Sequence, residues 1–306
     1  MDAVRFDRQK HQFALEDHTE DDDVLESVGA PLSMIVQVTR RCVLRCSFCS
    51  ESDEFPDPTT ASLMTLRQKL RGIRRVYLSG GEPLLRQDIF DLLRAYHDDF
   101  EVVGLPTSCT TIDRSVAKRL GGLVHYINTG LDGPRATNDL VRGNYDGILR
   151  GILNLRDAGL EVSLSTVVLT RTLPYMPYVV QVADTLGATK VKMAFPVLRG
   201  RAKTLPESEI TTKDETVRMF EKLVQLKKEL GWRPSIKLAL WDQNTEGYAL
   251  LVYPNQQVYA WPVYGAPDGV MHVGDLSKQD LEQIWQAYPF KRNHINKYVG
   301  RTTYNG

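Results

Sequence analysis

Short runs of apolar residues alternate along the chain with segments in which apolar residues recur every third or fourth position. Runs of this length are typical of buried strands, and the recurring segments are typical of amphipathic helices. Leu92 and Tyr96 illustrate the helical spacing, as do Ile148 and Ile152. The predicted strands are residues 34–39, 76–79, 101–105, 124–128, 161–169 and 190–195.

Six strands separated by helices predict a parallel sheet wrapped by those helices, because parallel neighbours need a crossover connection. Six such units fit a partial barrel better than a closed barrel of eight. We therefore predict an α/β fold, a partial (β/α)6 barrel with a small C-terminal α+β extension.

The pattern changes near residue 232, where short strand-like runs replace the alternation. Residues 236–240, 248–253 and 257–263 are predicted strands, and Pro254-Asn255-Gln256 is a plausible hairpin turn between the last two. A helix carrying Ile284 and Trp285 follows. These changes predict a barrel core at 34–203 and a C-terminal subdomain at 204–306.

Residues 1–33 are predicted to form an N-terminal extension. Seven acidic residues and no Lys or Arg lie between positions 16 and 26. A charge block of this kind is typical of a solvated segment.

The composition narrows the class of protein. Lys and Arg together number 38, as do Asp and Glu, so the net charge is zero. That balance gives no support for a nucleic-acid or anionic-membrane partner. The chain also lacks both an apolar run of membrane-spanning length and the apolar stretch of a signal peptide. A cytoplasmic location is the resulting expectation.

Three of the four cysteines lie within eight residues, directly after the first predicted strand. Cys42, Cys46 and Cys49 have the spacing C-x3-C-x2-C. In a reducing compartment such a cluster indicates a metal site, because thiolates are soft ligands for iron–sulfur clusters or zinc. Three ligands on one loop can hold three irons of a cubane and leave the fourth open. Zinc with a distant fourth ligand is the alternative, which the x3 gap disfavours.

This spacing, with Phe48 just before the third cysteine, resembles the signature of the radical S-adenosylmethionine (SAM) superfamily. The resemblance implies a [4Fe–4S] cluster on the three cysteines, with the open iron bound by the amino and carboxylate groups of SAM. One electron then splits SAM and releases a 5′-deoxyadenosyl radical. A flavodoxin or ferredoxin is the electron donor that the resemblance implies.

A second motif follows the second predicted strand. Gly80-Gly81-Glu82-Pro83 alone would indicate a turn, but one strand after the cysteine loop it resembles the GGEP motif that contacts the SAM amino group. The segments Leu131–Arg135, Arg142-Gly143 and Gly200-Arg201-Ala202 resemble the branch that contains sulfatase-maturating enzymes, the molybdenum-cofactor cyclase and peptide-modifying enzymes. The SAM-binding residues implied in this way are Phe48, Gly80, Gly81, Glu82, Pro83, Thr107, Ser108, Gly130, Asp132, Arg142 and Thr166.

Two strand ends depart from the pattern. Thr107-Ser108-Cys109 stands where relatives often have Thr-Asn-Gly, and Gly130 stands where they have Ser. The Cys109 thiol could donate a hydrogen atom to a substrate radical, although free cysteines are more often simply buried. Lys190, Lys192 and Arg199 could bind an anionic group, although solvated faces are the favoured interpretation.

The C-terminal region resembles the SPASM/twitch type of extension, which in relatives carries cysteines for auxiliary clusters. This chain has no cysteine after Cys109, and Trp261 stands near the expected first auxiliary ligand. We therefore expect no cysteine-held auxiliary cluster there, and a region that covers the barrel and shapes the substrate pocket.

These observations predict hydrogen-atom abstraction from a small polar metabolite, such as a sugar, nucleoside or amino-acid derivative. A redox-neutral epimerisation, elimination or decarboxylation fits the absence of auxiliary cysteines. The alternatives are a peptide-modifying enzyme of the same superfamily and a non-catalytic, metal-stabilised binding module.

Overall fold

The fold is described from a computed structural model that covers residues 4–7, 12–15, 28–51, 56–240, 245–300 and 304–306. The acidic stretch at 16–26 lies outside these residues. No helix in this part of the chain has the length and apolar character needed to cross a bilayer.

A single curved sheet of eleven strands dominates the structure, in the order β12-β11-β10-β3-β4-β5-β6-β7-β8-β9-β13. Neighbours from β3 to β8 are parallel, which confirms the six predicted strands and the parallel sheet. The strands are β3 (Ser33–Thr39), β4 (Arg75–Gly80), β5 (Val102–Pro106), β6 (Tyr126–Gly130), β7 (Val162–Val167), β8 (Lys190–Ala194), β9 (Ser235–Ala239), β10 (Ala249–Val252), β11 (Gln257–Trp261), β12 (Met271–Asp275) and β13 (Tyr304–Asn305).

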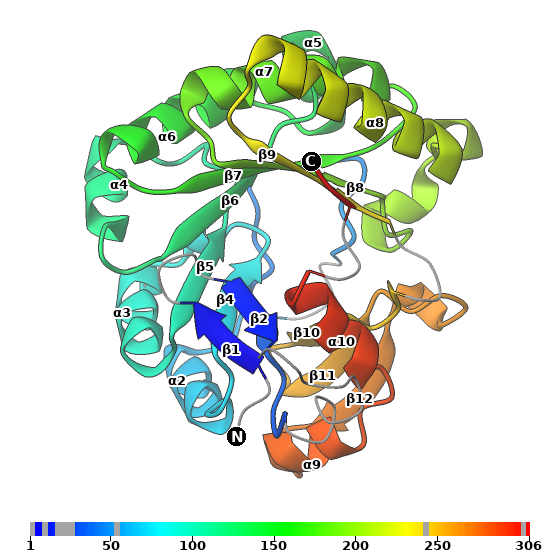
Figure 1. Cartoon of the computed structure of the whole chain (residues 1–306). Helices are drawn as coiled ribbons and strands as arrows, with labels where there is room; N and C mark the ends of the chain where they lie inside the picture. Colours follow the sequence, from blue (N-terminus) through cyan, green and yellow to red (C-terminus); the bar gives the residue numbers. More distant parts are fainter. Residues whose placement is uncertain (1–3, 8–11, 16–27, 52–55, 241–244, 301–303) are drawn as a thin grey trace.

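Helices wrap the outer face of this sheet (Figure 1). Three short helices, α4, α5 and α10, were not predicted from the sequence. The helices are α2 (Thr60–Lys69), α3 (Ile89–Asp99), α4 (Arg114–Leu120), α5 (Arg135–Val141), α6 (Tyr145–Asp157), α7 (Met176–Leu186), α8 (Lys213–Leu230), α9 (Leu281–Gln286) and α10 (Lys291–Tyr298).

The two faces of the sheet differ in polarity, because successive side chains of a strand point to opposite sides. Val36 and Val38 of β3 and Leu78 of β4 are fully buried in the apolar core under the helices. The alternate positions face the barrel interior and are largely polar, such as Gln37 and Ser79. The apolar core therefore lies outside the sheet, and the barrel interior is left for a polar site.

Residues after 204 do not form a sheet of their own. β9 lies parallel to β8, and β10 lies parallel to β3 at the other end of the same set of strands. α8 explains the position of β9, because its buried Phe220 and Leu223 pack it on the barrel as the earlier helices pack. The predicted hairpin between β10 and β11 is confirmed. Since β9 and β10 do not pair, the barrel stays open.

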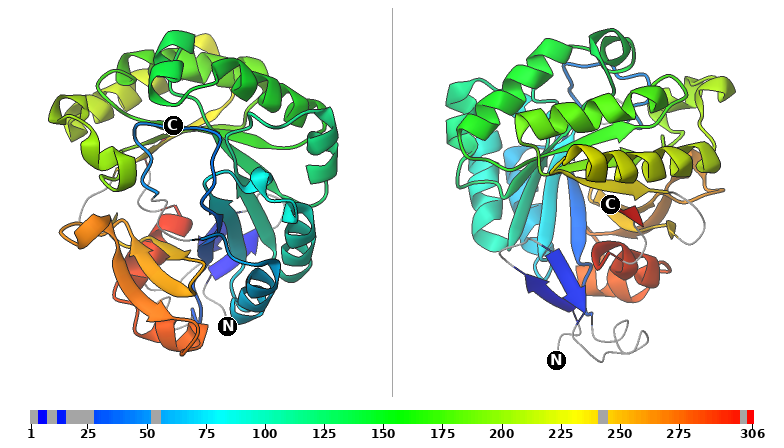
Figure 2. Two further views of the ribbon diagram at one scale, coloured as in Figure 1. Left: turned by 180° about the vertical axis from the view of Figure 1, so that it is seen from behind. Right: turned by 45° about the horizontal axis from the view of Figure 1, so that its top comes forward.

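A hairpin and a helix cover the end of the barrel at which the strands begin. The hairpin is β1 (Val4–Asp7) paired with β2 (Gln12–Leu15), and Figure 2 shows it at the end opposite the cysteine loop. The Arg75 guanidinium lies 4.8 Å from the Phe13 ring centroid and 6.0 Å from that of Tyr298 in α10. In the part of the chain that the structure describes, these contacts cover the end at which the strands begin.

Candidate active site

A cavity of about 410 Å³ lies at the carboxyl ends of the barrel strands. This is the end at which barrel enzymes place their chemistry. Ten predicted site residues line it: Cys42, Cys46, Phe48, Cys49, Gly80, Gly81, Thr107, Ser108, Gly130 and Arg142. Glu82, Pro83, Cys109, Asp132 and Thr166 do not.

The cysteine loop runs across the mouth of the cavity without helix or strand. Hydrogen bonds with two other segments hold its backbone in place. The Ser47 N–H donates to the carbonyl of Val141 in α5 (2.8 Å). The Arg201 Nε donates to the carbonyl of Cys46 (3.0 Å), so the short helix Gly200–Thr204 supports the loop from the β8 side.

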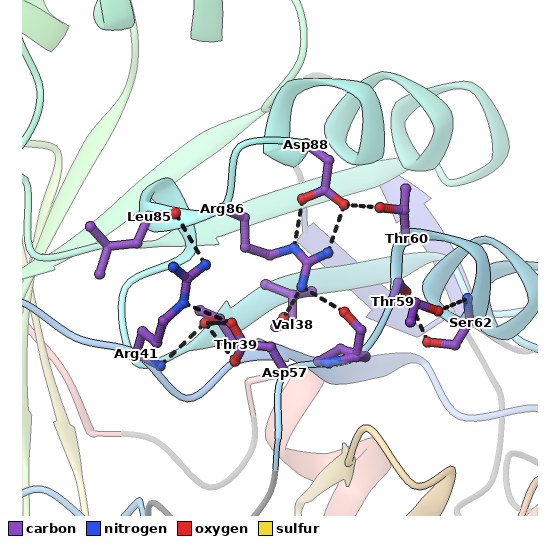
Figure 3. A network of polar contacts seen from close by, with 11 residues as sticks. Val38, Thr39, Arg41, Asp57, Thr59, Thr60, Ser62, Leu85, Arg86 and Asp88 are labelled. Atoms are coloured by element: carbon purple, nitrogen blue, oxygen red, sulfur yellow. Dashed lines mark hydrogen bonds and ion pairs between the residues drawn. The ribbon is translucent and has the colours of Figure 1, made fainter.

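A polar network ties both ends of the cysteine loop to the barrel (Figure 3). The Asp57 carboxylate accepts hydrogen bonds from the Thr39 hydroxyl (2.8 Å), the Arg40 N–H (2.8 Å) and the Arg41 Nε (2.9 Å). Burial raises the pKa of Asp57, but these hydrogen bonds outweigh it and hold that pKa below its ordinary value. The end of β3 and the chain after the loop are thereby joined.

Arg86 makes the second part of this network (Figure 3). Its buried guanidinium donates to the carbonyls of Val38 (2.9 Å) and Pro58 (3.0 Å), and the Asp88 carboxylate holds it by two further bonds. The two carbonyls lie on either side of the loop. One side chain therefore fixes the distance between the start and the end of the cysteine loop.

Gly80 and Gly81 permit a close approach between two backbone segments. The Gly81 N–H donates to the Thr39 carbonyl (2.9 Å), and the next N–H donates to the carbonyl of Arg41 (2.7 Å). A Cβ at either glycine would overlap these carbonyls, and Gly80 has a φ of +147°. The Gly-Gly turn therefore supports the backbone at the start of the cysteine loop and also forms part of the cavity wall.

Glu82 braces two strand ends. It is fully buried, and its carboxylate accepts hydrogen bonds from the hydroxyl of Thr107 (2.8 Å) and the N–H of Ser108 (2.7 Å). Pro83 begins the short helix Pro83–Leu85 behind it. The motif thus presents its glycines to the cavity, while its carboxylate joins the ends of β4 and β5.

Arg142 faces the cavity in a fixed orientation. Its Nε lies 2.6 Å from the fully buried carboxylate of Asp132, and its guanidinium lies 4.9 Å from the Phe48 ring centroid. A Cβ at position 130 would overlap this guanidinium. Gly130, a departure from the family pattern, is therefore explained by the side chain that takes the space.

Two predicted site residues lie in the core. Cys109 is fully buried, packs against Gly151 of α6, and has its pKa raised to about 12 by burial. Thr166 is also fully buried and donates to the carbonyl of Leu131 (2.6 Å). Neither side chain lines the cavity, in contrast to the ten predicted site residues that do.

The donor set fits an iron–sulfur cluster, because three free thiols on one loop border the cavity and thiolates are the usual cluster ligands. Burial raises the pKa of Cys42 and Cys46, and Arg201 and Arg142 respectively oppose that rise. In the described part of the chain no three Cys, His, Asp or Glu side chains already form a ligand group.

Sequence reasoning missed two residues in the deeper wall of the cavity, Asn128 and Ser165. They line it from neighbouring strands together with Lys192, which the sequence analysis named as a possible anion-binding residue. The signal was present, because these residues occupy the same alternate positions as Ser79, whose strand ends at the Gly-Gly turn. Trp261, which stands near the position expected for the first auxiliary ligand, also lines the cavity.

Residues 36–176, which include the cysteine loop and the Gly-Gly turn, match the Radical SAM superfamily. The chain carries a radical SAM domain. The predicted resemblance is thereby confirmed, and proteins of this superfamily bind a [4Fe–4S] cluster and SAM. The domain begins within β3 and ends at the start of α7.

Curated relatives of this radical SAM domain act on different substrates. Pre-heme d1 synthase of Dinoroseobacter shibae is 32% identical over 56% of this chain and 46% of its own length. GTP 3′,8-cyclase of Erythrobacter litoralis is 33% identical over 47% of this chain and 48% of its own length. PqqA peptide cyclase of Methylobacterium nodulans is 25% identical over 72% of this chain and 61% of its own length. The chain spans about half the length of the curated relatives it matches.

Solved radical SAM structures share the fold. SuiB of Streptococcus suis has a TM-score of 0.68 at 15% identity and covers 88% of this chain and 68% of its own. The anSMEcpe structure with bound AdoMet has a TM-score of 0.68 at 16% identity. The match covers 89% of this chain and 84% of the anSMEcpe chain. These likenesses include the C-terminal region, and they confirm the partial-barrel fold class.

Proposed function

We propose that this chain is a radical SAM enzyme, in which Cys42, Cys46 and Cys49 hold a [4Fe–4S] cluster and SAM occupies the adjoining cavity. The observation that carries the proposal is that the three thiols and the Gly-Gly turn border one cavity of about 410 Å³ at the carboxyl ends of the strands. A structural site does not need that cavity, because it is closed by its own ligands.

Each part of the wall has a role in this proposal. The turn at Gly80 and Gly81 lets a ligand approach backbone atoms next to the cysteine loop. Arg142, which Asp132 orients, is suited to a carboxylate through its charged hydrogen-bond donors. The Ser108 hydroxyl is held by Glu82 and can contact a ribose. When bound, the cluster and SAM supply a 5′-deoxyadenosyl radical for hydrogen-atom abstraction.

We propose a small polar metabolite as the substrate and a redox-neutral outcome. The chain has no cysteine after Cys109, so its C-terminal region offers no thiol ligands for a second cluster that could accept an electron. Asn128, Ser165 and Lys192 give the deeper cavity a polar wall. A flavodoxin or ferredoxin is the proposed electron donor.

Peptide modification is the second candidate. It is supported by PqqA peptide cyclase, which is similar over 72% of this chain, and by the likeness to SuiB, whose structure has also been determined with a precursor peptide. The two candidates differ in what must enter the cavity, a whole small molecule or one side chain of a peptide.

The test is anaerobic reconstitution with iron and sulfide, followed by dithionite and SAM, with mass spectrometry of the products. Formation of 5′-deoxyadenosine is expected, with loss in Cys42→Ala, Cys46→Ala and Cys49→Ala and persistence in the matched variant Cys109→Ala. A cluster that forms but leaves SAM intact under every reductant would favour the binding-module interpretation. Stoichiometric zinc in place of iron would refute the proposal.

A further inference from the structure

Positive charge gathers on the inner face of the barrel below the proposed SAM site. Val191 and Met193 of β8 are fully buried in the outer core, so the alternate residues Lys190 and Lys192 face inward. Lys192 lines the cavity itself. The sequence analysis favoured a solvated face for Lys192. The structure corrects this interpretation, because the Lys192 side chain lies in the barrel interior.

Further cations surround Lys192. Lys237 of β9 is its partner in the strand register, and Lys297 of α10 approaches from the closed end of the barrel. Burial, Lys190 and Lys237 lower the pKa of Lys192 to about 8. Burial and like-charged neighbours also lower the pKa of Lys237 and Lys297. An anion placed here would be favoured, because it would offset both repulsion and desolvation.

The inward positions of the parallel strands carry basic and neutral side chains, and Glu161, just before β7, partly offsets the charge of Lys190. From β3 to β9 those positions carry Arg75, three lysines, and polar or apolar residues, without Asp or Glu. Like charges gathered in a partly buried space are costly to the fold. Such a cost is typical of a binding site for the opposite charge.

Neutral hydrogen-bonding groups adjoin Lys192. The Asn128 amide donates to the hydroxyls of Ser163 (3.0 Å) and Ser165 (3.0 Å). Asn128 and Ser165 line the cavity together with Lys192, on strands that lie side by side. The hydroxyl and amide groups can direct hydrogen bonds to ligand oxygens, and the ammonium adds charge.

We propose that the substrate carries an anionic oxygen group, a carboxylate or a phosphate, that binds Lys192 with Asn128 and Ser165 in the barrel interior. That the bound molecule is the substrate rests on the proposed function, whereas the anion site itself does not. Arg40, Arg45, Arg142 and Arg201 line the cavity on the side of the cysteine loop, whereas Lys192 lines it from the barrel interior.

The test is calorimetric titration of the reconstituted protein, saturated with SAM and without reductant, at constant ionic strength in chloride. The probes are inorganic phosphate and succinate, in separate experiments. Binding of phosphate alone would assign a phosphorylated substrate, and binding of succinate alone a carboxylate. In either case we expect Lys192→Met to weaken the affinity for the anion about tenfold or more, because a hydrogen bond to a charged group contributes that much free energy.

Three variants complete the design. Lys192→Arg keeps the charge and is expected to keep most of the affinity, and Lys222→Met removes an exposed lysine of α8 and is expected to change nothing. If thermal unfolding shows that the Lys192→Met protein is not folded, the Lys192→Gln protein is used in its place. The proposal is overturned if neither anion binds, if the neutral variants bind as the wild type does, or if saturating SAM abolishes binding.

The same preparations separate this inference from the proposed function. If anion binding depends on Lys192 but no 5′-deoxyadenosine forms with dithionite and SAM, the radical function fails and the anion site stands. If 5′-deoxyadenosine forms and no anion binds, the function stands and the anionic substrate is refuted.

Discussion

At the scale of single residues, Gly130, Asp132 and Arg142 form one unit in the cavity wall. The guanidinium lies where a side chain of residue 130 would stand, and the buried carboxylate of Asp132 holds it there. Asp132 also accepts the Val167 N–H (3.0 Å), so this ion pair links β7 to the segment after β6. The glycine is required by its neighbour rather than by its own backbone conformation.

This coupling is open to a double-mutant cycle. Gly130→Ala is expected to displace Arg142 and to lower the free energy of unfolding by about 3 kcal/mol, since a buried carboxylate loses its partner. In the Arg142→Ala background the same change is expected to cost much less, because the overlap is gone. Urea denaturation of the four proteins measures both effects, and strictly additive costs would show that the two residues are independent.

Cys109 gives a second residue-level prediction. The thiol is fully buried, and its pKa is raised to about 12. We therefore expect Cys109→Ala to retain 5′-deoxyadenosine formation and, once a substrate is known, product formation. Deuterium incorporation from solvent into the product is the measurement. Loss of that label in the variant, with SAM cleavage intact, would restore the hydrogen-donor hypothesis.

The site residues were predictable to different extents for physical reasons. The cysteine spacing and the Gly-Gly turn are local patterns, so they could be found without knowing the fold. The role of Gly130 could not, because it depends on a guanidinium twelve positions later. Glu82 and Asp132 were found by their motifs, but which way their carboxylates turn depends on donors from other strands.

At the scale of elements, the cysteine loop is held by its surroundings rather than by secondary structure. Asp57 and Arg86 fix its two ends, and Val141 and Arg201 hold its middle (Figure 3 shows the two ends). These supports come from segments that follow β3, β4, β6 and β8. A loop supported in this way can offer three thiols to one ligand while remaining open on its cavity side.

The end of the loop can be loosened without touching a cysteine. Asp57→Ala removes acceptors for Thr39, Arg40 and Arg41, and we expect iron to be retained about 10-fold less well, because the chain just before Cys42 loses its anchor. Asp91→Ala on α3, which removes an exposed ion pair with Arg94, is the matched control. Release of iron to a chelator is measured, and equal release from both variants would contradict this role for Asp57.

The elements were predicted where the hydrophobic pattern was strong. The six strands from β3 to β8 and the β10–β11 hairpin were found because each has a clear apolar run and turn residues. β9 was found as a strand, but its pairing with β8 was not predicted, because strand pairing depends on where α8 packs. The inward direction of Lys192 likewise depends on which face of β8 the helices cover.

At the scale of the whole molecule, the C-terminal segment and the N-terminal hairpin close one end of the barrel and leave the other to the site (Figure 2). His294 of α10 is fully buried and accepts a hydrogen bond from the Leu32 N–H (3.0 Å). The Trp285 indole N–H donates to the carbonyl of Val28 (2.6 Å). These contacts join α9 and α10 to the residues that precede β3.

The closed end gives the protein a predictable sensitivity to acid. Burial lowers the pKa of His294 to about 3, below its unfolded value of about 6.5. The neutral ring therefore stabilises the fold fully above pH 6.5, and that contribution is lost as the pH falls toward 3. Between pH 7 and pH 5 the loss is about 2 kcal/mol.

The contribution of His294 is measured against a variant. His294→Gln keeps an acceptor for the Leu32 N–H but does not titrate, so its unfolding free energy is expected to fall less between pH 7 and pH 5 than that of the wild type. Urea denaturation at the two pH values gives the comparison. An equal fall in both proteins would mean that His294 does not carry the acid sensitivity.

The proposed function requires the three cysteines of the loop to hold a cluster with one iron open to SAM in the cavity beside it. Electron paramagnetic resonance of the dithionite-reduced, reconstituted protein tests it most directly. We predict a [4Fe–4S]⁺ signal whose g-values shift when SAM is added, and that is lost when any of the three cysteines is changed to Ala. A cluster signal that SAM leaves unchanged, or that survives in those variants, would contradict the account.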